Sequence, residues 1–161
     1  MGSPRLARYF RNMPTFRVSI SDLTTTTGVF MELVGVDNKD VKLRHVQITK
    51  PSVSLAPLKL EKLSPVSTTG TSTSILPAPF RGTTALATFK LYTVFPTKGT
   101  VIGRALQEAD LSTGEWMNEH YGDEDGSNPV PPLQSSTESY AWSVTVASLV
   151  NGYVEWTEEP Y

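Results

Sequence analysis

The stretch Val41–Ile48 reads VKLRHVQI, and its side chains alternate between apolar and polar types. An alternation of period two is typical of a β-strand that buries one face and exposes the other. The same pattern occurs in Phe16–Ile20 and in Tyr140–Val146. Val29–Val34 is instead a nearly continuous apolar run, which is expected of a strand covered on both faces. These stretches predict a protein built from strands.

Further strands are expected on both sides of these stretches. Thr84–Val94 is rich in residues that favour strands, and Leu55–Leu63 alternates apolar with basic residues. Near the end of the chain, Asn151-Gly152 has the composition of a tight hairpin turn. This turn is expected to pair Tyr140–Val146 with a last strand at Tyr153–Thr157.

Helical patterns are weak throughout the 161 residues. The only candidate of useful length is Arg104–Met117, and Gly114 interrupts it. Twelve prolines and eleven glycines disfavour long helices and favour short strands joined by defined turns. We therefore predict an all-β fold, a jelly roll or β-sandwich of about eight antiparallel strands, in a single domain over residues 15–161.

Residues 1–14 differ from the rest of the chain and form a short basic segment. Arg5, Arg8 and Arg11 recur every three positions with no acidic residue among them. The segment is expected to be either an arm that docks on an acidic partner surface or an unstructured tail, and Met13 allows a later natural start. Because it lacks an apolar core, it is not expected to be a signal peptide.

Thr113–Ser139 is expected to be a long exposed loop, of the kind that often contacts partners. Within it, Asp123, Glu124 and Asp125 offer the hard oxygen atoms that Ca²⁺ prefers. Their spacing does not match an EF-hand, in which acids stand at alternate positions and a distant glutamate completes the site. A solvated acidic loop is therefore the expected structure, and no metal or other cofactor is predicted.

Charge is distributed unevenly along the chain. All 14 basic residues lie at or before Arg104 with five of the 16 acids, so this part carries a charge of +9 and the remainder −11. The asymmetry predicts either ion pairs within the fold or a contact between copies of the chain. The overall charge of −2 argues against general nucleic-acid binding. The apolar runs are far shorter than the roughly 20 residues that span a membrane, so neither nucleic acid nor membrane is expected as a partner.

The groupings that catalysis needs are missing from the sequence. There is no cysteine, and the two histidines, His45 and His120, are not accompanied by a G-x-S-x-G nucleophile motif. Gly99–Gly103 lacks the lysine of a phosphate-binding loop, and no G-x-G-x-x-G occurs. Because His45 lies within an expected strand, we interpret it as a half-exposed strand residue rather than a general base. The chain is not expected to be an enzyme.

Four aromatic residues lie near the end of the chain: Tyr140, Trp142, Tyr153 and Trp156. In a strand, Tyr140 and Trp142 would share one face. Such a face could be a platform for carbohydrate, as in a carbohydrate-binding module or a glycan-active enzyme. A place in the core or in a subunit interface is the favoured interpretation, because large aromatic side chains are most often buried there.

Two groups of fragments follow an order and spacing that match a known pattern. Leu60–Ser64 and Thr68–Thr73 are similar to K-x-S…T-G-G-T-S-T, with Thr69-Gly70-Thr71 in place of the double glycine. A second group is similar to A-x-A-T…Y-T-x-x-P-T-x-x-G-T, and an acidic final strand accompanies it. These fragments are Thr84–Thr88, Tyr92-Thr93, Pro96-Thr97, Gly99-Thr100 and Val154–Glu159. Together they resemble small structural proteins encoded by tailed bacteriophages, and the acidic segment around Asp123 looks like an insertion.

The resemblance implies an all-β virion protein similar to the cement proteins that decorate phage heads. It implies binding to the major capsid protein, self-association as a homo-dimer or trimer, and no catalytic residues. It also implies synthesis in the host cytoplasm and a final place on the surface of the head, where Arg5, Arg8 and Arg11 would contact the capsid. The alternative within structural proteins is a tail or fibre component that binds a host receptor or glycan.

Overall fold

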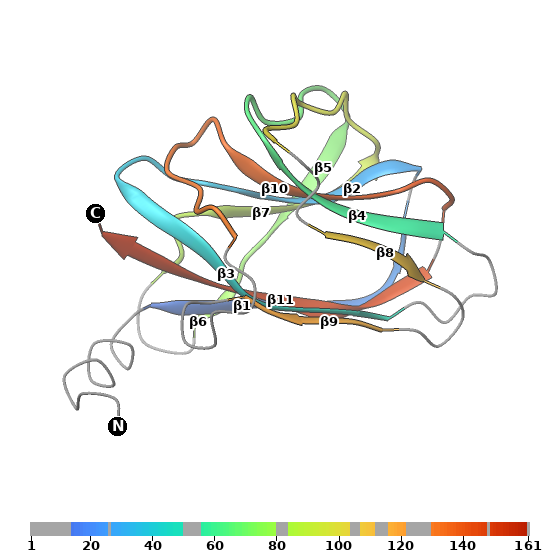
Figure 1. Ribbon diagram of the computed structural model, residues 1–161, viewed down its shortest axis with the longest axis horizontal. Coiled ribbons are helices and arrows are strands. Elements are labelled where there is room, and N and C mark those ends of the chain that lie inside the picture. The colour runs from blue at the N-terminus through green and yellow to red at the C-terminus, as the bar shows by residue number, and fades with distance from the viewer. Residues whose placement is uncertain are drawn as a thin grey trace.

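Two antiparallel sheets pack face to face in the computed structural model (Figure 1). It describes residues 14–25, 27–49, 56–79, 84–103, 107–111, 116–121, 130–147 and 149–160, and only the backbone of 56–57, 107–111 and 116–120. The five-stranded sheet has the order β6-β1-β11-β3-β9, and the six-stranded sheet has the order β5-β7-β2-β10-β4-β8. The strands are β1 (Thr15–Thr24), β2 (Gly28–Val34), β3 (Lys39–Thr49), β4 (Ala56–Leu63), β5 (Thr71–Ile75), β6 (Ala78–Pro79), β7 (Thr88–Val94), β8 (Gln107–Leu111), β9 (Trp116–His120), β10 (Ser139–Val144) and β11 (Leu149–Pro160).

Eight of these strands have the connectivity of a jelly roll. The first four, β1 to β4, alternate between the two sheets, β8 stays in the sheet of β4, and β9 to β11 alternate again. The resulting strand orders, β1-β11-β3-β9 and β2-β10-β4-β8, are those of two interleaved Greek keys. The prediction of an all-β sandwich is confirmed.

The remaining three strands belong to an insertion between β4 and β8, which we call the 64–106 insertion. Within it, β7 extends the six-stranded sheet beside β2, and β5 pairs with β7. The two-residue β6 pairs with β1 at the edge of the other sheet. The seven stretches predicted as strands did not include β5, β6, β8 or β9. β5 and β6 were missed because TSTSI and the dipeptide Ala78-Pro79 lack the apolar alternation of a half-buried strand.

Aromatic side chains fill the space between the sheets. Phe16, Phe89, Trp142 and Trp156 are each at most 1% exposed. The ring centre of Phe89 lies 6.1 Å from that of Trp156, with the rings nearly parallel, and 6.2 Å from that of Trp142. Such pairs contribute about 0.5–1.5 kcal/mol each beyond their buried area. The alternating residues of β1 supply Phe16 to this core, as the sequence predicts.

The neighbouring strands β1 and β11 bring the two ends of the described chain together. Thr15 is opposite Thr157, and Thr24 is opposite Leu149. Further along β11, Gly152 has a φ of +152°, and a Cβ there would lie 1.8 Å from the carbonyl oxygen of Gln47 on β3. This close approach of two backbones requires glycine. Both ends of the described chain leave the sandwich on the same side (Figure 1).

Two local predictions near the end of the chain are wrong. Asn151-Gly152 lies inside β11 and is not a turn. The strands β10 and β11 belong to different sheets, so they do not form a hairpin. The glycine serves close packing against β3 instead, which a reading of local turn preferences does not detect.

The central region of the chain also differs from the prediction. The helix candidate Arg104–Met117 contains β8 and the start of β9, because pairing with β4 and β3 overrides a weak helical preference. The expected loop Thr113–Ser139 includes β9 and a buried Leu133, whose backbone exchanges hydrogen bonds of 2.8 and 2.9 Å with Val41. The basic arm with Arg5, Arg8 and Arg11 and the acidic segment 122–128 lie outside the described residues.

Candidate partner-binding surface

The 64–106 insertion covers part of the outer face of the six-stranded sheet. A small apolar cluster lies there, separate from the main core, and consists of Val29, Leu63, Tyr92 and Ala141 with Val101 packed against it. Backbone hydrogen bonds of 2.8 and 2.9 Å between Thr68 and Thr97 hold two parts of the insertion together. The insertion therefore explains why β2 is buried on both faces, as its continuous apolar run predicts.

A buried carboxylate joins the insertion to the sheet. Glu32 on β2 is 0% exposed and accepts hydrogen bonds from the backbone N–H of Ser67 (3.1 Å) and from Tyr92 Oη (2.7 Å). Ser139 on β10 donates a third hydrogen bond, from its Oγ to Glu32 Oε1. Burial of a charged group is costly unless hydrogen bonds replace its hydration. These three donors, one of them from the insertion backbone, are what allows Glu32 to be buried.

The surroundings of Glu32 also affect Tyr92. Burial, and then the hydrogen bond to the Glu32 carboxylate, raise the pKa of the Tyr92 phenol well above its ordinary value. Both carboxylate oxygens of Glu32 are occupied by protein donors. The cluster is therefore suited to holding the insertion in place and is not arranged for proton transfer to a ligand.

A second buried carboxylate has a similar structural role in the other sheet. Glu158 on β11 is 4% exposed and accepts hydrogen bonds from the backbone N–H groups of Leu86 (2.9 Å) and Ala87 (3.0 Å). It also accepts one from Trp156 Nε1 at 3.1 Å. Glu158 thus fixes the segment that precedes β7.

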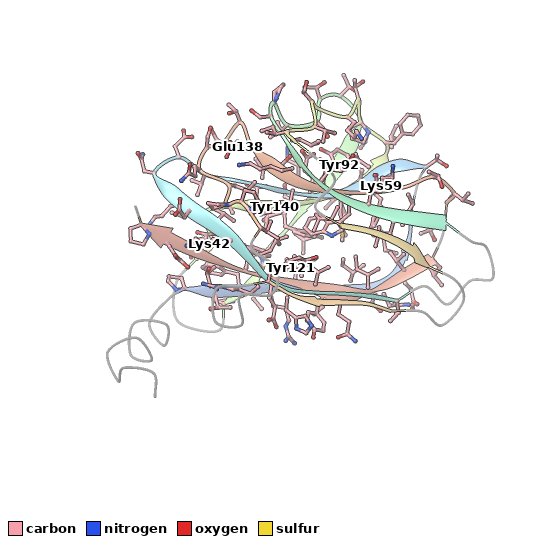
Figure 2. The ribbon with its side chains drawn as sticks, viewed as in Figure 1. Lys42, Lys59, Tyr92, Tyr121, Glu138 and Tyr140 are labelled. Atoms are coloured by element: carbon pink, nitrogen blue, oxygen red, sulfur yellow. The ribbon has the colours of Figure 1, made fainter. Side chains whose placement is uncertain are left out.

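An open pocket of about 490 Å³ lies where the insertion meets the sheet. Four segments far apart in sequence line it: Thr27–Val29 at the start of β2, Lys59 on β4, Pro96 and Lys98 in the insertion, and Ser143–Thr145 at the end of β10. Lys98 Nζ lies 2.7 Å from Glu61 Oε2. Lys59 is on the outer side of the six-stranded sheet, whereas Tyr140 lies between the two sheets (Figure 2).

The border of this pocket is apolar and exposed. Phe95 is 59% exposed, and its ring lies within 3.9 Å of the position that a Cβ on Gly28 would occupy. Val146, which follows the lining residue Thr145, is 43% exposed. A group of large apolar side chains at the rim of a concavity is typical of a surface that binds another protein. We call Phe95, Val146 and the pocket the insertion-side surface.

The outer face of the five-stranded sheet is polar, and its charges interact with one another. Arg17 forms an ion pair with Glu155, and its guanidinium carbon lies 4.2 Å from the ring centre of Tyr153. Tyr153 Oη and His45 Nδ1 lie 3.0 Å apart. The strand residue His45 is half-buried, as the sequence predicts, and its contact with Tyr153 gives it a packing role.

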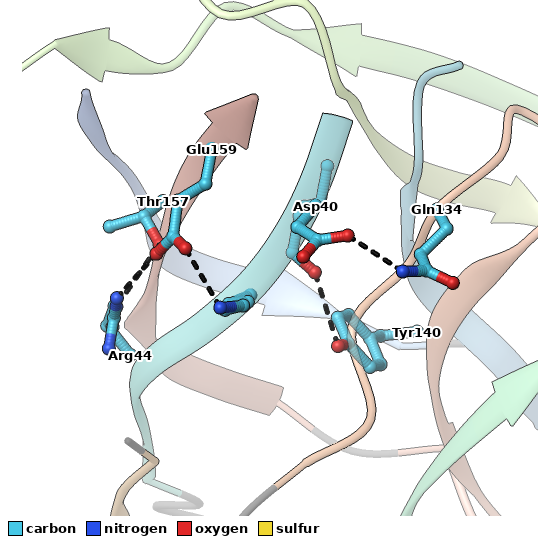
Figure 3. Close-up of polar contacts among 8 residues, drawn as sticks. Asp40, Arg44, Gln134, Tyr140, Thr157 and Glu159 are labelled. Atoms are coloured by element: carbon cyan, nitrogen blue, oxygen red, sulfur yellow. Dashed lines mark hydrogen bonds and ion pairs between the residues drawn. The ribbon is translucent and has the colours of Figure 1, made fainter. Parts of the chain in front are cut away.

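A bulge in β3 adds a second charged group to the sheet. Trp156 is opposite Leu43 and Glu155 is opposite His45, so Arg44 is an extra residue. Arg44 Nη2 and Lys42 Nζ each lie 2.8 Å from a carboxylate oxygen of Glu159 (Figure 3). Such partly exposed pairs contribute little individually to stability. These ion pairs mean that the charged side chains of this face named above pair with one another.

The uneven charge of the sequence is partly neutralised within the fold. Of the five ion pairs between the described residues, four join a base before Arg104 to an acid after it: Arg17–Glu155, Lys42–Glu159, Arg44–Glu159 and Lys62–Glu138. The fifth, Lys98–Glu61, lies at the pocket. Pairing within the fold therefore accounts for at least part of the asymmetry.

The structure decides between the interpretations of three aromatic residues. Tyr140, Trp142 and Trp156 are each 0% exposed. A carbohydrate platform built on them is therefore wrong, and the core interpretation is confirmed. Among the described residues, no group of three His, Asp or Glu side chains is placed to hold a metal ion. The described part of the chain also has no helix long and apolar enough to cross a membrane.

The sequence matches no family model, no curated protein and no solved structure. The insertion-side surface also has no linear signature, because its lining comes from four separate segments. The nearest local signal is Val94-Phe95-Pro96, in which apolar residues continue past the end of β7. Sequence reasoning noted the strand and did not identify the surface.

Proposed function

We propose that this chain is a capsid decoration (cement) protein of a phage virion, and that the insertion-side surface is its contact with the shell. The proposal starts from the resemblance of the sequence fragments to phage structural proteins. A jelly roll with buried aromatics and a polar, internally paired face suits a rigid building part. The chemistry expected of it is the burial of surface against a partner, with no bond made or broken.

The observation that supports a docking role most directly is the exposure of Phe95. Full burial of a phenylalanine side chain contributes about 1.5–3 kcal/mol, and Phe95, at 59% exposed, would gain part of this on docking. Val146 continues the apolar border, and Lys59 and Lys98 stand at the pocket. The complementary partner surface is an apolar projection that fits the pocket.

A cement function follows from mass action. A protein that binds the assembled shell and not the separate subunits stabilises the assembled state by RT ln(1 + [L]/Kd). At a free concentration of 100 times Kd this amounts to about 2.7 kcal/mol for each site. Many weak sites on one shell therefore add up to a large effect.

Mass spectrometry of purified particles tests the location. We expect a ratio to the major capsid protein that is near-stoichiometric, as for a protein that covers the shell. A few to a few tens of copies would instead support the tail or fibre alternative. Absence from the particles would overturn a virion function.

A matched pair of variants tests the surface. Phe95→Ser is expected to weaken binding to emptied shells by roughly 2 kcal/mol, or about 30-fold, because it removes an aromatic anchor. Leu86→Ser is the control, since Leu86 is 57% exposed, close to the 59% of Phe95, and lies outside the pocket lining. Equal losses from both variants would contradict the assignment of this surface.

A further inference from the structure

The strand β5 is the open edge of the six-stranded sheet. It pairs with β7 on one side, and no described strand pairs with it on the other. The outer edge of such a strand presents backbone N–H and C=O groups without sheet partners, which makes it a template for a further strand. By contrast, β6, at an edge of the other sheet, is protected against a further strand, because it is only two residues long and ends in Pro79.

The side chains of β5 do nothing to block a further strand. Its sequence is TSTSI, with Thr71–Ser74 exposed and no charged residue or proline among them. Natural proteins usually protect an open edge with lysine, proline, a bulge or a very short strand. Here the one irregularity is a shift in register between Thr71 and Ser72, at the first residue. The outer edge of β5 is therefore free of the features that usually prevent a further strand from pairing with it.

We infer that the occupant is β5 of a second copy, paired antiparallel about a two-fold axis at Thr73. In this register Thr73 is opposite the same residue of the other copy, and Ser72 is opposite Ser74. Threonine and serine pairs across strands form favourable contacts, and the absence of charge removes repulsion at the axis. The pairing joins the six-stranded sheets of two copies into one continuous sheet.

An exposed leucine lies beside the proposed contact between copies. Leu76 directly follows β5 and is 83% exposed, the highest value among the large apolar side chains of the described residues. The register ends at the opposed pair Thr71 and Ile75, because Gly70 has a φ of +72° and leaves the extended conformation. Leu76 therefore lies just beyond the last opposed pair, where pairing of two copies would reduce its exposure.

The proposed contact joins two copies of the chain and does not depend on which other partner the chain binds. The test uses the full chain in isolation, without particles. Because the chain contains no cysteine, single cysteine variants report geometry without background. Directly opposed residues in an antiparallel pair have Cα atoms about 4.5–5.5 Å apart, within the range that a disulfide spans.

Thr73→Cys is therefore expected to form a disulfide-linked dimer rapidly under mild oxidation. Thr71→Cys is the matched control, because two copies of residue 71 are four positions apart along the strands, roughly 13 Å. Mixing Thr71→Cys with Ile75→Cys should restore crosslinking, since those two positions are opposed. If Thr73→Cys crosslinks no faster than Thr71→Cys alone, the inference is wrong.

Sedimentation analysis provides the second arm. The unmodified chain is expected to be a dimer at micromolar concentration, and Thr73→Lys should weaken it by at least about tenfold because two ammonium groups meet at the axis. Ser19→Lys, at an exposed position on β1, should leave the dimer intact. A chain that stays monomeric, forms a trimer, or dimerises equally well as Thr73→Lys overturns the inference. If such a chain still binds shells, the proposed function stands without it.

Discussion

Removing the hydroxyl group of Tyr92 tests whether the Glu32 cluster holds the insertion in place. In Tyr92→Phe the ring still fills its site in the small apolar cluster, and only the 2.7 Å hydrogen bond to Glu32 Oε2 is lost. Glu32 is 0% exposed, so water does not replace the donor without opening the structure. Leaving a buried acceptor without its partner costs about 1–3 kcal/mol, and more for a charged group.

We therefore expect Tyr92→Phe to lower the free energy of unfolding by about 2–3 kcal/mol. For a domain of this size, each kcal/mol shifts the melting temperature by roughly 2–4 °C, so the expected decrease is about 4–12 °C. Urea titration should show a lower midpoint with an unchanged slope. Tyr153→Phe is the control, because it loses a contact with His45 on a half-buried sheet face. Its cost should stay below about 1 kcal/mol.

A double-mutant cycle identifies the charge as the cause. In a Glu32→Gln background the buried charge is absent, so Tyr92→Phe should cost at least 1 kcal/mol less, by a rough estimate for contacting groups. If the cost is the same in both backgrounds, or if Tyr92→Phe is no more harmful than Tyr153→Phe, then the cluster does not have the structural role given to it here.

Two further outcomes follow from features of the fold. Burial, and then the nearby carboxylates, raise the pKa of Tyr140, and burial and Glu32 raise the pKa of Tyr92. The folded state therefore keeps both phenol protons above pH 10, where the unfolded chain loses them. The free energy of unfolding should fall above that pH by up to about 1.4 kcal/mol per pH unit for each tyrosine, and urea titrations of Tyr140→Phe between pH 9 and about 11 should show a shallower decline. Gly152→Ala should destabilise by roughly 2 kcal/mol or more, because its Cβ would lie 1.8 Å from the Gln47 carbonyl oxygen; a thermal melt within 2 °C of the parent, about 1 kcal/mol or less, would contradict this.

Period-two patterning was sufficient to predict most of the jelly roll. Phe16–Ile20 alternates and forms part of β1 with Phe16 and Val18 buried, whereas the nearly continuous apolar run Val29–Val34 forms β2, which is buried on both faces as expected. The bulge at Arg44 is the informative exception. Two consecutive polar residues, Arg44 and His45, interrupt the alternation of Val41–Ile48, and both belong to one bulged strand. Two adjacent polar residues within an alternating strand therefore indicate the extra residue of the bulge.

What the sequence did not reveal depends on contacts between distant segments. The pocket combines Gly28, Lys59, Lys98 and Ser143, which no local pattern relates to one another. The buried role of Glu32 is equally hidden, because a glutamate within an apolar run does not show whether its partners are donors or cations. Pairing of strands far apart in the chain decides both, and it also decides whether Asn151-Gly152 turns or extends.

Because β1 and β11 are neighbours, both ends of the described chain lie on the same side of the sandwich, and this decides where a fused peptide or domain would project. Pro14 and Pro160 lie at one end of the sandwich, whereas Gly28 and Thr145 of the pocket follow and precede the opposite ends of the same two strands. A peptide or domain fused at either end of the described chain would project away from the insertion-side surface. If that surface docks on a shell, Pro14 and Pro160 lie at the end of the sandwich away from the shell.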